Sequence, residues 1–451
     1  MKKLSYIVLA VVLMTAGGCG IFGKYNPQTS VPDNLFGSDS FAKAMSQDSS
    51  IATISWREFF TDPCLRDLID TALARNTDAV TARLKVEEAK AALTAAKLGF
   101  LPAISFTPSL NLTPGNSYSL PFNLQWGTDG FGSITNKKRE ANALALQAMD
   151  YEKYVRSGLV STVAGLYAQL LLYDKQLEIM KEAETLFAKA VETQKALMEN
   201  GKAYSTSVNQ LEASLLNVSI MKIDAENVIR NLESSMCIVL HQTPQPVRRS
   251  SPDTYELRNN FGTGIPAGIL ANRPDIRMAE HSLEAAFYVT NGARAAMIPG
   301  LSLTGLLGWA NNGMAITDPL NLVYNAVLSL AQPVFAQGKL SANLKISKLQ
   351  QQEAAEQFAQ AVINAGNEVN MALADCQMAV RKDELYKKQV SILKDAFDGT
   401  RLLMDNGKTT YLEVLTAQES YLDAMLQDAV NIYNGTQSLI DLYEALGGGV
   451  E

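Results

Sequence analysis

Two long tracts of the chain carry apolar residues in alternating steps of four and three. The first runs over Leu159, Val163, Leu166, Leu170, Tyr173, Leu177 and Met180, and the second over Phe358, Val362, Ala365, Val369, Ala372 and Cys376. This spacing is typical of coiled-coil seams. No proline lies between Phe122 and Gln242 or after Pro333, and very long helices require such tracts. The pattern predicts helices over 132–198 and 338–404, each 67 residues and roughly 100 Å long.

The second tract repeats the first in phase. Val163, Leu166 and Leu170 shifted by 206 positions coincide with Val369, Ala372 and Cys376, and residues 199–202 match residues 405–408 at the same offset. At an offset of 197, residues 75–78 match 272–275 and residues 100–105 match 297–302. Four matches in the same order indicate an internal duplication.

Each half of the duplication is predicted to be helix, hairpin, very long helix, tight turn and helix. The predicted parts are a signal peptide (1–18), a lipid-anchored segment (19–62), a first repeat (63–243), a linker (244–271), a second repeat (272–446) and a tail (447–451). The first repeat has helices over 63–98, 132–198 and 203–243, and the second has helices over 273–297, 338–404 and 409–446.

The two hairpins are long enough to cross a membrane. Their strands are predicted near 101–112, 117–127, 300–311 and 322–332, with rough alternation of apolar positions. About ten residues span a bilayer at a tilt, but four strands cannot close a barrel, and open strand edges are not tolerated in lipid. A membrane interpretation therefore requires several chains. The alternative is that the hairpins are water-soluble caps on a helical rod.

The N-terminus has the features of an export signal. Lys2 and Lys3 precede an apolar run over 4–14, which is too short for a permanent span, and small residues follow up to Cys19. These small residues resemble a lipobox, in which the cysteine is lipidated and begins the mature chain, although Ala16 stands where the pattern prefers Leu. The alternative is an incidental Cys19 and cleavage by a general signal peptidase. No stretch of 18 apolar residues follows, so we expect no transmembrane helix.

Charge and residue chemistry exclude several functions. The net charge of −7, from 39 Lys+Arg and 46 Asp+Glu, argues against a nucleic-acid partner. His241 and His281 are far apart, and no Cys or carboxylate at ligand spacing is identified beside either. We therefore expect no metal site, no Ser/His triad and no enzyme.

Several stretches resemble the TolC/OprM-like outer membrane efflux proteins, in particular the lipoprotein branch known as NodT. The matching stretches are residues 264–277 with their Arg-Pro-Asp block, 295–305, 332–335 with Gly338, 407–418, and the Leu-Gly-Gly-Gly end at 446–449. The resemblance implies a mainly α homotrimer with membrane β structure. Long coiled-coil helices would form an α-barrel across the periplasm, and four strands per chain would build a shared 12-stranded barrel in outer membrane lipid.

The same resemblance implies partners and candidate sites. The partners would be a periplasmic adaptor protein and an inner-membrane transporter of the RND type, and the only cofactor would be the covalent lipid on Cys19. The Asn-Gly-Lys turns would form the periplasmic tip that contacts the adaptor, through Asn200, Gly201, Lys202, Asn406, Gly407 and Lys408. The family's two acidic gate positions fall on Glu413 and Thr416, of which only Glu413 keeps a carboxylate, and the matching polar pair is Thr206 and Ser207.

Arg273, Pro274 and Asp275 have a structural interpretation as a helix start, with Asn272 as N-cap. Glu413 could equally lie on an ordinary solvated helix face. Our leading hypothesis is a passive efflux channel that is gated at its periplasmic tip. The alternative is a lipid-anchored coiled-coil structural protein of the envelope without a pore.

Overall fold

The computed structural model describes residues 22–26, 54–111, 117–129, 131–252, 273–310, 321–332 and 335–450. The predicted signal peptide, Cys19, Asn272 and most of the predicted linker lie outside these residues. The chain divides into two compact units, and each unit takes residues from both halves of the duplication. The sheet unit comprises 1–30, 83–151 and 275–362, and the tip unit comprises 31–82, 152–274 and 363–451.

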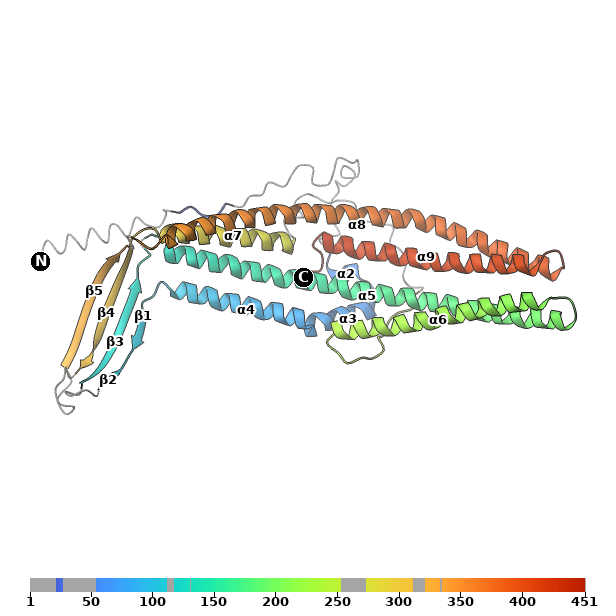
Figure 1. Cartoon of the computed structure of the whole chain (residues 1–451), viewed down its shortest axis with the longest axis horizontal. Coiled ribbons are helices and arrows are strands. Elements are labelled where there is room, and N and C mark those ends of the chain that lie inside the picture. Colours follow the sequence, from blue (N-terminus) through green and yellow to red (C-terminus); the bar gives the residue numbers. More distant parts are fainter. Residues whose placement is uncertain are drawn as a thin grey trace. The chain divides into compact units, whose positions relative to one another are not determined.

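Corresponding helices of the two halves have equal lengths (Figure 1). Helices α4 (Thr77–Leu98) and α7 (Pro274–Ala295) each have 22 residues. The long helices α5 (Ser133–Glu199) and α8 (Lys339–Asp405) each have 67 residues, as predicted. Helices α6 (Ser205–Val239) and α9 (Tyr411–Ala445) each have 35 residues. These equal lengths agree with the predicted internal duplication.

The prediction of one helix over 63–98 is wrong, because α3 (Pro63–Arg75) ends before α4 begins. Asn76 separates the two helices. Its Oδ1 accepts hydrogen bonds from the N–H groups of Asp78 and Ala79, at 2.8 and 3.3 Å, and so caps α4. Its Nδ2 donates to the carbonyl of Val239, 2.9 Å away, which fixes the break against the end of α6. A short helix, α2 (Trp56–Phe59), precedes α3.

The predicted coiled-coil seams face the protein interior. Leu159, Val163, Leu170 and Met180 are buried on α5, and the remaining predicted positions of that seam are half-buried. On α8, the seam from Val362 to Cys376 is buried, and Phe358 is half-buried. In the tip unit, apolar side chains of α5, α6 and α9 form one core cluster that includes Phe187, Leu211 and Leu422.

Helix α5 departs from the expectation that no helix could span a membrane. Among the described residues, it alone contains an 18-residue stretch that is long and apolar enough to do so, by length and composition. Of that stretch, 56% is buried inside the protein, as is usual for a helix that packs in a core.

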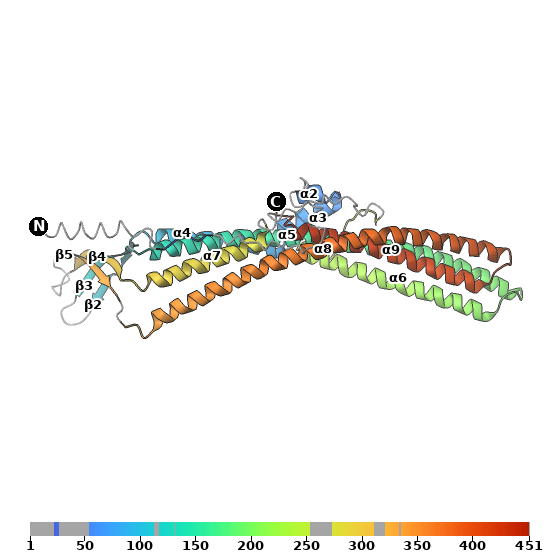
Figure 2. The same ribbon diagram turned by 90° about the horizontal axis from the view of Figure 1, so that it is seen from above.

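The strands form one antiparallel sheet in the order β1, β3, β4, β5, with β2 also paired to β3 (Figures 1 and 2). β1 (Ala103–Phe106) and β2 (Ser109–Asn111) share one register on β3 (Ser117–Gly127), so they are two parts of the single predicted strand. The interruption falls at Pro108, which has no N–H to donate. β4 (Gly300–Ala310) and β5 (Asn321–Ala331) follow the predicted bounds within one residue.

The glycine-rich end of the chain closes around Tyr443 in the tip unit. The Tyr443 ring stacks on Phe59 with centroids 4.2 Å apart, and its hydroxyl donates to the carbonyl of Ile54 and accepts from Gly449 N–H, both at 3.0 Å. A Cβ added at Gly448 would lie 2.4 Å from the ring. Gly447 and Gly449 have φ angles of 83° and 78°. The Leu-Gly-Gly-Gly end therefore lets the backbone pass over an aromatic ring.

We predict that Gly448→Ala destabilises the protein by about 1–3 kcal/mol, because the added methyl overlaps a ring held by stacking and two hydrogen bonds. Chemical unfolding of the detergent-solubilised protein, followed by circular dichroism, measures this change. Gly292→Ala is the matched control, since Gly292 lies within α7 with open space around its Cβ position. Equal unfolding midpoints for the two variants would contradict the proposed overlap.

Candidate functional site

The strand register divides the sheet into two chemically different faces. On one face, aligned side chains from neighbouring strands are apolar or aromatic. They include Ile104, Phe106, Leu120, Phe122, Leu124, Trp126, Leu303, Leu307, Trp309, Leu322, Tyr324 and Leu328. Many are well exposed, including Ile104 at 68% and Tyr324 at 78%. An apolar face of this kind suits contact with hydrocarbon rather than water.

The opposite face is mostly polar or small. Its aligned positions include Ser105, Thr107, Ser119, Asn123, Gln125, Ser302, Thr304, Asn325 and Ser329. Three apolar residues also lie on this face, namely Leu306, Val323 and Val327. At these positions the strands do not alternate strictly between apolar and polar residues. A polar face opposite an apolar one is the pattern of a strand wall between lipid and an aqueous lumen.

Both outer strands of the described sheet pair on one side only. β1 and β2 pair with β3, and β5 pairs with β4, which leaves two strand edges with unpaired backbone groups within the described sheet. A sheet in lipid must pair such edges. This chain therefore cannot form a closed barrel from its described strands alone.

The two predicted tip turns have the same geometry. Gly201 and Gly407 have φ angles of 71° and 69°, which glycine adopts without strain. Lys202 N–H donates to the carbonyl of Leu197 at 2.8 Å, and Lys408 N–H donates to Leu403 at 2.9 Å. The Asn200 and Asn406 side chains each donate to the carbonyl four residues earlier, at 2.7 Å. The two turns, at equivalent positions of the duplication, therefore form the same hydrogen bonds.

The four predicted gate residues begin the two helices that follow these turns. Thr206, Glu413 and Thr416 are exposed, and Ser207 is half-buried. The Ser207 hydroxyl donates to the carbonyl of Tyr204 at 2.7 Å and accepts from Gln194 Nε2 at 2.9 Å. Within the described part of the chain, no two of the four are hydrogen bonded to one another.

Glu413 lies in the first turn of α9, where the helix dipole favours a carboxylate. Its carboxylate accepts from the hydroxyl of Thr409, one residue before the N-cap Thr410. The Thr416 hydroxyl donates to the carbonyl of Leu412 at 2.9 Å. The Thr409 hydroxyl therefore holds the exposed Glu413 side chain in the first turn of α9, beside the tip turn.

Arg273 has a role that its sequence context did not reveal. α7 begins at Pro274, and the Arg273 side chain, which is 7% exposed, lies outside the helix. Its Nη1 donates to the carbonyl of Ala445 at 2.7 Å, and its Nη2 contacts Glu368 at 2.6 Å. Arg273 therefore connects the start of α7 to α8 and to the last turn of α9.

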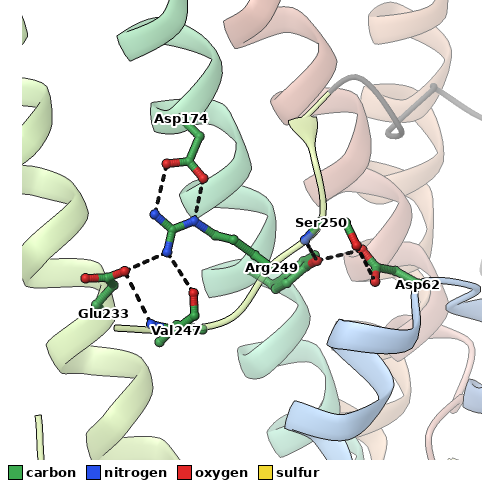
Figure 3. Close-up of polar contacts among 7 residues, drawn as sticks. Asp62, Asp174, Glu233, Val247, Arg249 and Ser250 are labelled. Atoms are coloured by element: carbon green, nitrogen blue, oxygen red, sulfur yellow. Dashed lines mark hydrogen bonds and ion pairs between the residues drawn. The ribbon is translucent and has the colours of Figure 1, made fainter. Parts of the chain in front are cut away.

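A second connection lies in the predicted linker. Arg249 contacts both oxygens of Asp174 on α5, and its Nη1 lies 2.6 Å from Glu233 on α6 and 2.9 Å from the carbonyl of Val247 (Figure 3). The hydrogen bonds to Asp174 are the main reason that the pKa of Arg249 is raised. The adjacent Ser250 hydroxyl donates to Asp62, 2.9 Å away (Figure 3). No sequence motif marks these partners, because they lie far apart along the chain.

His281 corrects the expectation that no carboxylate lies at ligand spacing beside either histidine. Its Nδ1 is 3.2 Å from Glu284, one turn along α7, and its Nε2 is 3.4 Å from the buried Asp150 on α5. Contact with Asp150 is the main cause that raises the pKa of His281. The two carboxylates approach opposite ring nitrogens, so they do not converge on one point as ligands of a single metal ion would.

A sheet with one apolar and one polar face, joined to two helices of 67 residues each, is the architecture of an outer membrane channel protein. The chain belongs to the outer membrane efflux protein family, whose model matches residues 68–234 and 265–448. The predicted fold class, a TolC-like trimer with an α-barrel and a shared β-barrel, is confirmed. The chain is an outer membrane channel of an efflux system, as predicted.

Two relatives and two solved structures illustrate this placement. The cation efflux system protein CusC of Escherichia coli O6:H1 is 27% identical over 450 residues, which cover 97% of each chain. SilC of Salmonella typhimurium, named a probable outer membrane lipoprotein, is 25% identical, and the match covers 100% of this chain and 99% of SilC.

A CusC crystal structure has a TM-score of 0.78 at 26% identity and covers 90% of this chain and 97% of its own. The outer-membrane channel OprN has a TM-score of 0.85 at 21% identity, with 94% and 99% covered, and supports the fold.

We predict that Phe106→Asp impairs assembly of the channel, because a carboxylate facing hydrocarbon is destabilising, although it costs less than the roughly 2–4 kcal/mol of a Lys or Arg at the bilayer midplane. Ser105→Asp, on the neighbouring residue and the polar face, is expected to assemble normally. The heat-resistant oligomer band on a gel measures assembly of both variants. Equal band intensities for the two variants would contradict the assignment of the apolar face, rather than the polar face, to lipid.

Proposed function

We propose that this channel conducts small molecules passively from the periplasm to the exterior, with its gate at the tips of the two helical hairpins. The two-faced sheet is the observation that carries the proposal, because it supplies a polar wall for a lumen and an apolar wall for lipid. The channel carries out no chemistry of its own on the molecules it conducts.

Glu413 is the central residue of the proposed gate. In a trimer, three copies of this exposed carboxylate would surround the axis, with Thr206 and Thr416 as polar neighbours. Like charges close together attract cations and disfavour anions. Ser207 acts differently in this proposal: its contacts with Gln194 and Tyr204 keep the adjoining turn in place.

The tip turns are the proposed contact with a periplasmic adaptor protein. Both turns are exposed at Asn200, Gly201, Asn406 and Gly407, and each carries one lysine, Lys202 or Lys408. An inner-membrane transporter of the RND type would complete the tripartite pump. A partner opens such a gate only by binding the open form more tightly than the closed form.

The position of Phe22 and the name of one relative support lipidation of Cys19. Phe22, three residues after Cys19, lies close to Gly132 at the start of α5 and hence beside the sheet. Three residues of extended chain reach at most about 11 Å. A lipid on Cys19 could therefore enter the membrane beside the strands, and the name of SilC as a probable outer membrane lipoprotein agrees with this proposal.

The gate predicts a change in ion selectivity. Glu413→Gln should lower the preference for cations, and Glu413→Lys should reverse it. Each unit change in charge should alter the selectivity for cations over anions by roughly fivefold, since a close charge pair in water is worth about 1 kcal/mol. Single-channel recordings in planar bilayers measure conductance and reversal potential. Glu353→Gln, an exposed carboxylate on α8 far from the tip turns in sequence, is the control. Identical selectivity of wild type and both Glu413 variants would remove Glu413 from the gate.

Lipidation is tested by metabolic labelling with palmitate. Wild-type protein should be labelled and Cys19→Ala should not, because the thiol of Cys19 would carry the lipid. The unlipidated variant is expected to stay largely in the membrane fraction once it reaches the outer membrane, since the strands also hold it there. Equal labelling of the two proteins would show that Cys19 is not the acceptor.

A further inference from the structure

Basic residues gather where the helices of the sheet unit meet the sheet. Residues 90–139 and 294–352 together contain nine Lys and Arg but two Asp, in a chain that has 39 Lys+Arg and 46 Asp+Glu overall. The exposed lysines nearest to the helix ends are Lys97, Lys137, Lys138, Lys339 and Lys345. We call these five residues the basic collar.

The fold brings the basic collar to one end of the sheet. β1 and β4 begin there and β3 and β5 end there, because the strands are antiparallel in that order. Figures 1 and 2 show α4, α5, α7 and α8 meeting the sheet at this end. Lys97 is one residue from the end of α4, Lys339 begins α8, and Lys137 is four residues into α5. At 1.5 Å per residue, all five lysines lie within about 10 Å of a helix end.

Glu140 interacts electrostatically with Lys137 and so offsets part of the charge of the basic collar. In the part of the chain that the structure describes, none of the five lysines forms an ion pair. Asp129, the nearest carboxylate before α5, accepts hydrogen bonds from the N–H groups of Ile134 and Thr135 and so caps that helix. Most of the positive charge of the basic collar is therefore available to a partner outside the chain.

The apolar face of the sheet continues up to the basic collar. Trp126 lies in the row of Leu303 and Leu328 on that face, and it is 39% exposed. Its Nε1 donates to the carbonyl of Phe100 at 3.0 Å, and Lys138 Nζ lies 5.9 Å from the Phe100 ring centroid. From the sheet toward the helices, apolar side chains are followed by a tryptophan and then by cations. The same order is met on passing from hydrocarbon through the headgroups into water.

We propose that the basic collar binds anionic phospholipid headgroups of the periplasmic leaflet around the barrel. The proposal rests on the assignment of the apolar face to lipid. Each cation near an anionic surface contributes to binding, and this attraction fades within a Debye length of about 8–10 Å. The collar would thereby fix the depth of the strands in the membrane.

Quenching of Trp126 by brominated lipids tests the proposal. The full-length channel carrying Trp309→Phe is reconstituted into phosphatidylcholine vesicles with 30% phosphatidylglycerol, and either lipid is brominated in turn. Trp56 is buried in the tip unit, and its signal is subtracted with a Trp126→Phe variant. We expect brominated phosphatidylglycerol to be favoured at Trp126 by about threefold or more at low salt, and the preference to approach unity in 0.5 M salt.

Replacing the five collar lysines by Gln should abolish the preference. The matched control replaces five exposed lysines of the tip unit, Lys181, Lys189, Lys382, Lys388 and Lys394, and should retain it. No preference in the parent protein, or a preference insensitive to salt, would overturn the proposal even if the five-lysine variant fails to fold. Absence of quenching by either lipid would instead overturn the assignment of the apolar face to lipid.

Discussion

A strand in hydrocarbon must find a hydrogen-bond partner for every backbone N–H and C=O, because no water is present to replace one. Within the described sheet, the backbone groups between neighbouring strands are hydrogen bonded, whereas those along the outer edges of β1, β2 and β5 have no strand partner. Only strands of other chains can complete those edges within a membrane. The oligomeric channel of this fold class therefore follows from backbone chemistry, before any side chain is considered.

The duplication explains how one chain supplies both the sheet and the hairpins. Each repeat contributes one β-hairpin, and β3 of the first repeat pairs with β4 of the second over nine residue pairs. The equal 67-residue helices then extend from equivalent strand ends, so that both repeats reach their turns after the same number of residues. A difference in length between α5 and α8 would change the position of one turn along its helix by about 1.5 Å per residue.

The sequence predicted elements well where local chemistry decides them. Heptad spacing, proline placement and turn glycines located the long helices, the strands and both tip turns within about two residues. The break at Asn76 was missed because it depends on a contact with Val239, 163 residues away. The contacts of Arg249 with Asp174, Arg273 with Glu368 and His281 with Asp150 were missed for the same reason, since each joins residues that only the folded chain brings together. The contact of His281 with Glu284 is local, and the sequence analysis overlooked their spacing of three residues.

The two tip turns show where the repeats have diverged in chemistry while keeping their geometry. The position after the first turn holds Ser207, and the equivalent position after the second holds Glu413. Ser207 has a partner on the preceding long helix, Gln194, whereas the residue equivalent to Gln194 is Thr400, whose hydroxyl donates to its own helix at Ala396. The second turn therefore offers Glu413 no such partner on α8, and its carboxylate stays at the surface.

This divergence limits the charge that the tip can present. Since only one of the two equivalent helix starts carries a carboxylate, a trimer would have three such charges around its axis rather than six. Three separated carboxylates repel one another less than six would, and water at the tip screens them further. Closure of the tip would then depend more on the apolar packing of α5, α6 and α9 than on neutralising the ring of charge.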